Sequence, residues 1–133
     1  MIKGGGKFSV TKIVKFDAAH RLPGYDGACV NLHGHTWKVE VEVRLSDEQM
    51  YDPSKDEMLA DFGEIKGVLK ARFLDRIDHS YINSAIGEVN YPSAENITLW
   101  IKDRLINAFP NYLTLHRVRV WESETAYAEW RER

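Results

Sequence analysis

Three histidines in this sequence have the spacing of a metal site. His33 and His35 stand two residues apart in one stretch of alternating residues, and His20 closes an earlier stretch of the same kind. Positions i and i+2 of a β-strand face the same side, about 6.5–7 Å apart, so both imidazoles of the pair can converge on one point. Three neutral imidazoles without a fourth protein ligand are typical of a catalytic zinc, which keeps one position open for water or substrate.

Two predicted strands would bring these histidines together. Residues 8–20 carry apolar side chains at alternate positions, and residues 36–45 alternate strictly between apolar and polar. If these strands pair antiparallel, the end of the first lies beside the start of the second, and residues 21–32 fold over the metal as a loop. A His-X-His pair alone is a weak signal, and an ordinary surface histidine is the alternative interpretation. His116 lacks any such context, so we predict a strand residue without metal.

The rest of the chain predicts two helices and two more strands. Apolar residues recur at spacings of three and four from Asp61 to about Arg76, and again from Pro92-Ser93 to Pro110. Residues 115–121 and about 125–130 alternate as strands do. The order strand, strand, helix, helix, strand, strand predicts an α+β fold, with two helices on one face of an antiparallel sheet. No linker divides it, so we expect residues 1–133 to form one domain, with residues 1–7 as a flexible head.

Composition excludes several classes of protein. The 133 residues carry a net charge of −2, which argues against a general nucleic-acid binder. A single cysteine excludes an internal disulfide framework. No apolar run approaches the roughly 20 residues of a membrane-spanning helix, and the first residues lack the apolar core of a signal peptide. We therefore expect a cytoplasmic protein.

Short motifs along nearly the whole chain resemble one known family. The segments FDAAHRL (residues 16–22) and CVNLHGH (residues 29–35) resemble the 6-pyruvoyl-tetrahydropterin synthase superfamily. Later landmarks match in the same order: Asp61-Phe62, Ile77-Asp78-His79, Pro92-Ser93-Ala94-Glu95-Asn96 and Val118-Arg119-Val120-Trp121-Glu122. The three residues between Cys29 and His33 resemble the compact spacing of the 6-carboxy-tetrahydropterin synthase branch of queuosine biosynthesis.

The resemblance implies a reaction and a cofactor. The substrate of that branch is 7,8-dihydroneopterin triphosphate, and the products are 6-carboxy-5,6,7,8-tetrahydropterin, acetaldehyde and triphosphate. The implied cofactor is Zn²⁺, held by His20, His33 and His35. As a Lewis acid it would bind the side-chain oxygens of the substrate, acidify them and stabilise the developing negative charge.

The resemblance also assigns the proton transfers. Cys29 would be the general base, and Asp78 would orient His79, which accepts or relays the proton. A thiol needs a nearby positive charge or a histidine partner to lower its pKa for this role. The alternative for Cys29 is a small buried apolar residue, and the alternative for the Asp78-His79 pair is a favourable helix C-terminus.

Glu122 is the residue that the resemblance assigns to the pterin ring. A carboxylate can accept two parallel N–H hydrogen bonds from the amino-pyrimidinone edge. Ser123 follows it where threonine is common in the family, and a shift of two residues would put Glu124 in its place. An exposed carboxylate at the end of a strand is the other interpretation of either residue. Ser93 and Glu95 are expected to cap the second helix.

The family resemblance implies a tunnelling fold (T-fold) and an assembly. Three subunits close a barrel through their sheet edges, and two trimers stack into a homohexamer with Cys29 and Asp78-His79 meeting across an interface. The partner is a small pterin triphosphate, with no nucleic acid and no membrane. Two other functions stay open. One is a 6-pyruvoyl-tetrahydropterin synthase on the same scaffold, and the other is a non-enzymatic metal- or pterin-binding protein.

Overall fold

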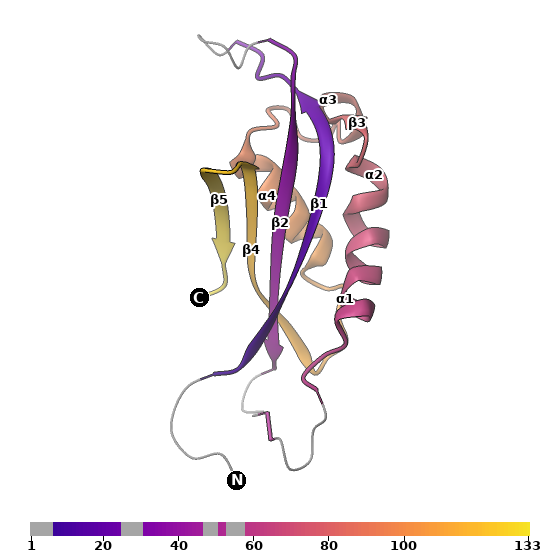
Figure 1. Ribbon diagram of the computed structural model, residues 1–133, viewed down its shortest axis with the longest axis vertical. Coiled ribbons are helices and arrows are strands. Elements are labelled where there is room, and N and C mark those ends of the chain that lie inside the picture. The colour runs from indigo at the N-terminus through magenta and orange to yellow at the C-terminus, as the bar shows by residue number, and fades with distance from the viewer. Residues whose placement is uncertain (1–6, 25–30, 47–50, 53–57) are drawn as a thin grey trace.

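The computed structural model describes residues 7–24, 31–46, 51–52 and 58–133. Its elements follow in the order β1 (Ser9–His20), β2 (His33–Leu45), α1 (Phe62–Leu69), η2 (Lys70–Leu74), α2 (Asp75–Ile77), β3 (Ser80–Tyr81), α3 (Ile82–Ala85), α4 (Ala94–Leu105), β4 (Leu113–Ser123) and β5 (Ala126–Arg131). The helices lie on one side of a twisted sheet, as Figure 1 shows, so the predicted α+β arrangement is confirmed. None of the helices in the described ranges is long and apolar enough to cross a membrane.

The sheet has the strand order β3-β1-β2-β4-β5. Strands β1 and β2 pair antiparallel over their whole length, from Ser9 opposite Arg44 to His20 opposite His33. Strands β2–β4 and β4–β5 are also antiparallel. The two-residue strand β3 was not predicted, and it runs parallel to the end of β1. The predicted four-stranded antiparallel sheet is therefore a five-stranded sheet with one parallel pair.

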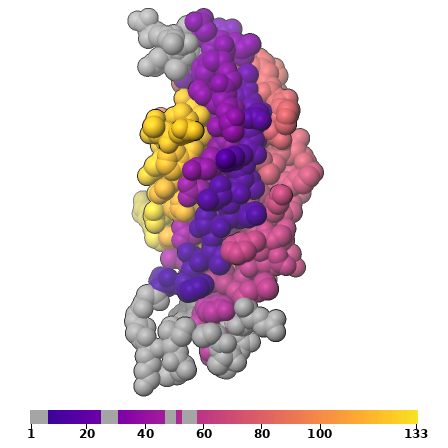
Figure 2. Space-filling view, in the orientation of Figure 1, coloured from indigo at the N-terminus to yellow at the C-terminus, as the bar shows by residue number. Residues whose placement is uncertain are grey.

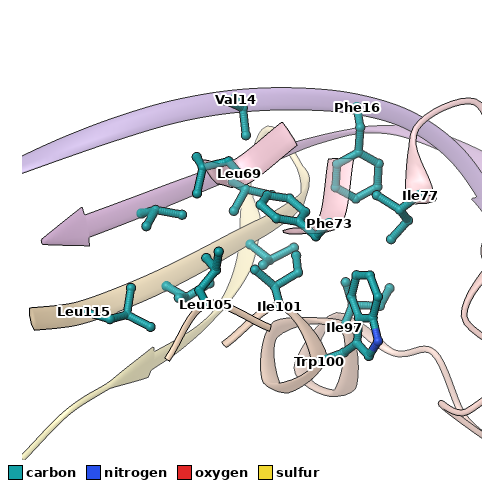
Figure 3. Close-up of a cluster of buried hydrophobic side chains, with 14 of the residues drawn as sticks. Val14, Phe16, Leu69, Phe73, Ile77, Ile97, Trp100, Ile101, Leu105 and Leu115 are labelled. Carbon is teal, nitrogen blue, oxygen red and sulfur yellow. The ribbon is translucent and has the colours of Figure 1, made fainter. Parts of the chain in front are cut away.

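The core fills the space between the sheet and the helices. Alternation along β2 places four side chains on the covered face, where all are fully buried: Trp37, Val39, Val41 and Val43. Figure 3 shows side chains of β1 and β4 meeting side chains of the helices in one cluster that includes Phe16, Phe73 and Ile101. Burial of a large apolar side chain contributes about 1.5–3 kcal/mol, so this layer fixes the helices on the sheet.

Side-chain caps start the two main helices. The carboxylate of Asp61, the N-cap of α1, accepts the backbone N–H of Gly63 at 2.7 Å. The hydroxyl of Ser93 accepts the N–H of Asn96 at 3.2 Å at the start of α4. Helix α4 ends at Leu105, earlier than the predicted end at Pro110. Segments α1, η2 and α2 follow one another as a single coiled ribbon beside the sheet (Figure 1).

The opposite face of the sheet is polar. Figure 2 views the molecule from this side, with β1 and β2 along the middle. At its centre the buried guanidinium of Arg117 lies 2.7 Å from Glu42, 3.4 Å from Glu40 and 3.5 Å from Glu129. This face therefore consists of paired charges across neighbouring strands rather than an apolar layer.

Candidate functional site

The three histidines converge at one end of the sheet. His20 ends β1 and is the register partner of His33, the first residue of β2, while His35 follows on the same face. Their ring centroids lie 4.5 Å apart for His20 and His33, 4.8 Å for His33 and His35, and 5.5 Å for His20 and His35. One ring nitrogen of each lies within 4.8 Å of the other two, so the cluster can hold a metal ion.

Backbone carbonyl groups determine which ring nitrogen of His20 and of His33 stays free to bind a metal. Nδ1 of His20 lies 2.8 Å from the carbonyl oxygen of Pro92, and Nδ1 of His33 lies 2.7 Å from that of Asn31. A carbonyl only accepts, so each Nδ1 carries the proton and donates it. Nε2 of each neutral ring then keeps its lone pair free, which is the arrangement that metal-binding histidines use.

Burial keeps the central ring neutral. The His20 side chain is fully buried, and this desolvation lowers the pKa of its imidazole, against the opposing effect of the hydrogen bond to Pro92. The indole of Trp37 packs edge-on beneath the site, 5.0 Å from the His20 ring and 5.5 Å from the His35 ring. The indole N–H donates to the carbonyl of Ala18 at 3.2 Å, which fixes the orientation of this support.

The donor set fits a divalent cation of the zinc type. Nε2 of His20 and Nε2 of His35 are buried and have no hydrogen-bond partner among the described residues. Buried polar atoms in proteins are almost always satisfied, so two buried ring nitrogens without a partner in one cluster fit a site for a cation. Imidazole nitrogens suit zinc and its neighbours in the first transition row.

Glu122 brings a negative charge to the same point. One carboxylate oxygen lies 3.7 Å from Nε2 of His20, and the other lies 3.8 Å from Nε2 of His35. Glu122 lies within β4 rather than at its end, on the face that carries the buried side chains of Val118 and Val120. Glu124 lies in the turn before β5, so the carboxylate that the structure brings to the histidines is that of Glu122.

A cleft opens beside this carboxylate. It has a volume of about 640 Å³ and lies between the start of α4 and strand β5. Glu122 forms part of its wall, together with Glu95, Leu99, Tyr127 and Trp130. Glu95, expected to cap the helix, therefore lines the cleft. One residue, Glu122, belongs both to the wall of the cleft and to the surroundings of the histidine cluster.

Asp78 and His79 form a separate pair beside β1. Oδ1 of Asp78 lies 3.0 Å from Nδ1 of His79 and accepts the N–H of Asp17 at 3.0 Å. The N–H of His79 in turn donates to the carbonyl of Asp17 at 2.7 Å. His79 has a φ of 58°, which is rare for a residue with a side chain, and its imidazole is 78% exposed. The pair is thus rigidly held, with its imidazole presented to the outside.

Of the other candidate residues, the structure describes His116, Asp78 and His79, and none of these belongs to the histidine cluster. Cys29 falls outside the described residues. His116 lies on β4 with Nδ1 3.2 Å from Oε1 of Glu132, and it is not part of the histidine cluster. His79 lines a shallow depression together with Asp17, His35, Thr36 and Ser80. Asp17 and Thr36 are exposed members of the alternating strands and belong to the sheet face opposite the core, whereas His20 follows the buried residues of β1.

Several supporting groups of the site have no signal in the sequence. The carbonyls of Pro92 and Asn31 fix the histidine tautomers, but any residue type supplies a carbonyl. The side-chain amide of Asn83 binds the backbone of Arg21, just after β1. Its Oδ1 accepts the N–H of Arg21 and its Nδ2 donates to the carbonyl of Arg21, both at 3.0 Å. The sequence could have indicated Trp37 as a neighbour of the site, because it stands two residues after His35 and so lies on the same face of the strand.

Known proteins resemble this chain over nearly its whole length. The family model described as "6-pyruvoyl tetrahydropterin synthase" matches residues 9–133. The chain is 32% identical over 144 residues to a Haemophilus influenzae protein named 6-carboxy-5,6,7,8-tetrahydropterin synthase, covering 94% of this chain and 99% of that one. It is 35% identical over 121 residues to a Synechocystis protein of the same name, covering 91% of each.

The fold is shared with a solved enzyme structure. The 6-pyruvoyl tetrahydropterin synthase of Caenorhabditis elegans superimposes with a TM-score of 0.79 at 20% identity, covering 96% of this chain and 97% of that one. At this identity the match establishes the T-fold, as predicted. The match to the family model over nearly all of the sequence, together with relatives above 30% identity, shows that the chain belongs to the 6-pyruvoyl tetrahydropterin synthase family.

Proposed function

We propose that this chain is a zinc-dependent 6-carboxy-5,6,7,8-tetrahydropterin synthase. It would convert 7,8-dihydroneopterin triphosphate to 6-carboxytetrahydropterin, acetaldehyde and triphosphate in the biosynthesis of queuosine or a related deazapurine. The observation that carries the proposal is the cluster of three histidines whose free nitrogens lie within 4.8 Å of one another. The names of the two bacterial relatives support the carboxy branch.

The chain's own groups would hold and orient the reactants. His20, His33 and His35 hold the cation, which polarises the side-chain oxygens of the substrate when it is bound. Glu122 accepts the N–H groups of the pterin edge from the wall of the adjacent cleft. This places the ring in the cleft and its side chain toward the histidines.

A thiol and an imidazole would move the protons. Cys29 removes a proton from a side-chain carbon, and His79, oriented by Asp78, relays it. His79 is not one of the three clustered histidines, and its exposed imidazole lies at a shallow depression that Asp17, His35 and Thr36 also line. We therefore propose that the Asp78-His79 pair serves the Cys29 of a neighbouring subunit.

The assembly would be a cytoplasmic homohexamer of single-domain subunits. Within the described residues β1 pairs with β3 only through Ala18 and Ala19, so the first half of β1 is an edge. Strand β5 forms the other edge of the sheet. Unpaired edges favour association between chains, and a closed ring of subunits satisfies both at once.

The decisive experiment is incubation with dihydroneopterin triphosphate followed by mass analysis of the products. We expect 6-carboxytetrahydropterin, acetaldehyde and triphosphate, with all three suppressed by a metal chelator. A 6-pyruvoyl-tetrahydropterin synthase is the second candidate, because the matching family model carries that description. Full release of triphosphate without acetaldehyde would establish that second function and exclude the first.

A further inference from the structure

Two kinds of acceptor face each other at the histidine cluster. Nε2 of His20 bears a lone pair, because its Nδ1 is committed as a donor to Pro92. A carboxylate oxygen of Glu122 lies 3.7 Å away, and its second oxygen lies 3.8 Å from the unpartnered Nε2 of His35. Two acceptors repel each other unless a proton or a cation lies between them.

A hydrogen bond does not account for this contact. The two distances exceed the usual N–H···O range, and no hydrogen bond joins Glu122 to either ring. In a tetrahedral zinc site with bonds of about 2.0–2.1 Å, neighbouring ligand atoms lie on the order of 3.3 Å apart. The separations of 3.7 and 3.8 Å are close to that spacing.

We propose that Glu122 is the fourth ligand of the cation while no pterin is bound, and that pterin binding withdraws it. The inference rests on the metal centre and on the pterin-anchoring role of the proposed function. The position of Glu122 in the wall of the cleft gives it two competing partners, the cation on one side and the pterin edge on the other.

This arrangement links substrate recognition to the opening of the metal site. A catalytic zinc needs a free position for its substrate, and a glutamate ligand closes that position. When the pterin edge takes the carboxylate of Glu122, the ring becomes anchored and the fourth position becomes available in the same event. Ligands without an amino-pyrimidinone edge lack the N–H groups that withdraw Glu122, so the closed site excludes them.

The test compares metal binding by purified protein, not turnover. Zinc affinity is measured by competition with a chromophoric chelator, and the visible spectrum of the Co²⁺-substituted protein reports the ligand set. Glu122→Gln should lower the zinc affinity at least about tenfold and change the Co²⁺ spectrum. Glu64→Gln, which removes an exposed carboxylate in α1, is the matched control and should change neither. Saturating neopterin should shift the wild-type spectrum toward that of Glu122→Gln.

The experiments distinguish the failure of three claims: Glu122 as a ligand, its withdrawal by pterin, and the metal centre itself. Zinc affinity and a Co²⁺ spectrum of Glu122→Gln that both equal those of the wild type overturn Glu122 as a ligand. A wild-type spectrum that saturating neopterin leaves unchanged overturns its withdrawal. If wild-type protein binds no stoichiometric metal, or if His33→Ala binds it equally well, the metal centre of the proposed function fails instead. Circular dichroism confirms that each variant is folded, and Glu122→Ala provides a second truncation.

Discussion

Nδ1 of His20 lies 2.8 Å from the carbonyl oxygen of Pro92, a residue 72 positions later in the sequence. This contact joins the end of β1 to the segment that leads into α4. It fixes both the tautomer and the plane of a fully buried imidazole. The geometry of the histidine cluster therefore depends on the packing of α4 against the sheet, as well as on the pairing of β1 with β2.

The first prediction concerns the ligand assignment. His33→Ala should lose bound metal and activity together, because it removes one of three nitrogens that meet at one point. Metal content is measured by elemental analysis after gel filtration. His116→Ala is the matched control, since His116 contacts Glu132 and lies outside the cluster, and it should keep the metal. Full metal occupancy in His33→Ala would contradict the assignment.

A second prediction separates proton transfer from metal binding. Asp78→Asn weakens the hold on Nδ1 of His79, because an amide presents either a neutral oxygen or an N–H donor to the ring. We expect kcat to fall about 100-fold or more while metal content stays at the wild-type level. Parallel kinetics and metal analysis check this. Normal turnover in the variant would exclude a role for Asp78 in orienting His79.

Cys29 provides a third prediction. If it is the general base, Cys29→Ala abolishes turnover and leaves the metal bound, since the three histidines remain. A non-enzymatic binding protein would show no change in any measured property. Product formation by the variant, followed by mass spectrometry with dihydroneopterin triphosphate, decides between the two.

Sequence periodicity predicted the position of the three histidines, because their placement depends on the local pattern of two strands. The alternation in β1 and β2 predicted that His20, His33 and His35 meet if the two strands pair antiparallel, and they do pair so. Residue types also predicted that Ser93 caps α4. Strand β3 was missed, because two residues are too few to show a period and their pairing depends on the long-range contact with Ala18 and Ala19.

The side to which Glu122 points could not be predicted from simple alternation. Counting by twos from the buried Leu115 would place Arg117 and Trp121 on the core face and Glu122 on the open face. The register of β4 against β2 shifts at Glu42/Val43, and this irregularity reverses the alternation. It places Glu122 on the side of the histidines.

The pKa of His20 gives a fourth prediction, on the stability of the metal-free protein. Burial lowers this pKa below the ordinary value of 6.5 in the folded state. As the pH falls below about 6.5, the unfolded chain binds a proton at His20 that the folded chain does not, so the free energy of unfolding decreases. Well above pH 6.5 His20 is neutral in both states, so it does not change the free energy of unfolding with pH. Urea titrations between about pH 5 and pH 8 measure the slope, which should flatten in His20→Gln.

A fifth prediction concerns the open face of the sheet. Burial raises the pKa of the Glu42 carboxyl, but hydrogen bonds from Ser9 and Arg117 outweigh this and hold it below its ordinary value. Arg117→Met removes the shared cation and leaves three carboxylates from two strands facing one another: Glu40 and Glu42 of β2 and Glu129 of β5. We expect a loss of about 2–3 kcal/mol at pH 7, measured by urea denaturation.

The same variant has a pH signature that a loss of packing would not produce. Protonation of the crowded carboxylates relieves their repulsion, so the stability deficit of Arg117→Met should shrink as the pH falls toward the ordinary pKa of glutamate. Lys70→Met is the matched control, because it breaks an exposed ion pair with Asp75. It should cost less than about 0.5 kcal/mol. A deficit in Arg117→Met that is the same at every pH would show that packing, and not charge pairing, is the contribution of Arg117.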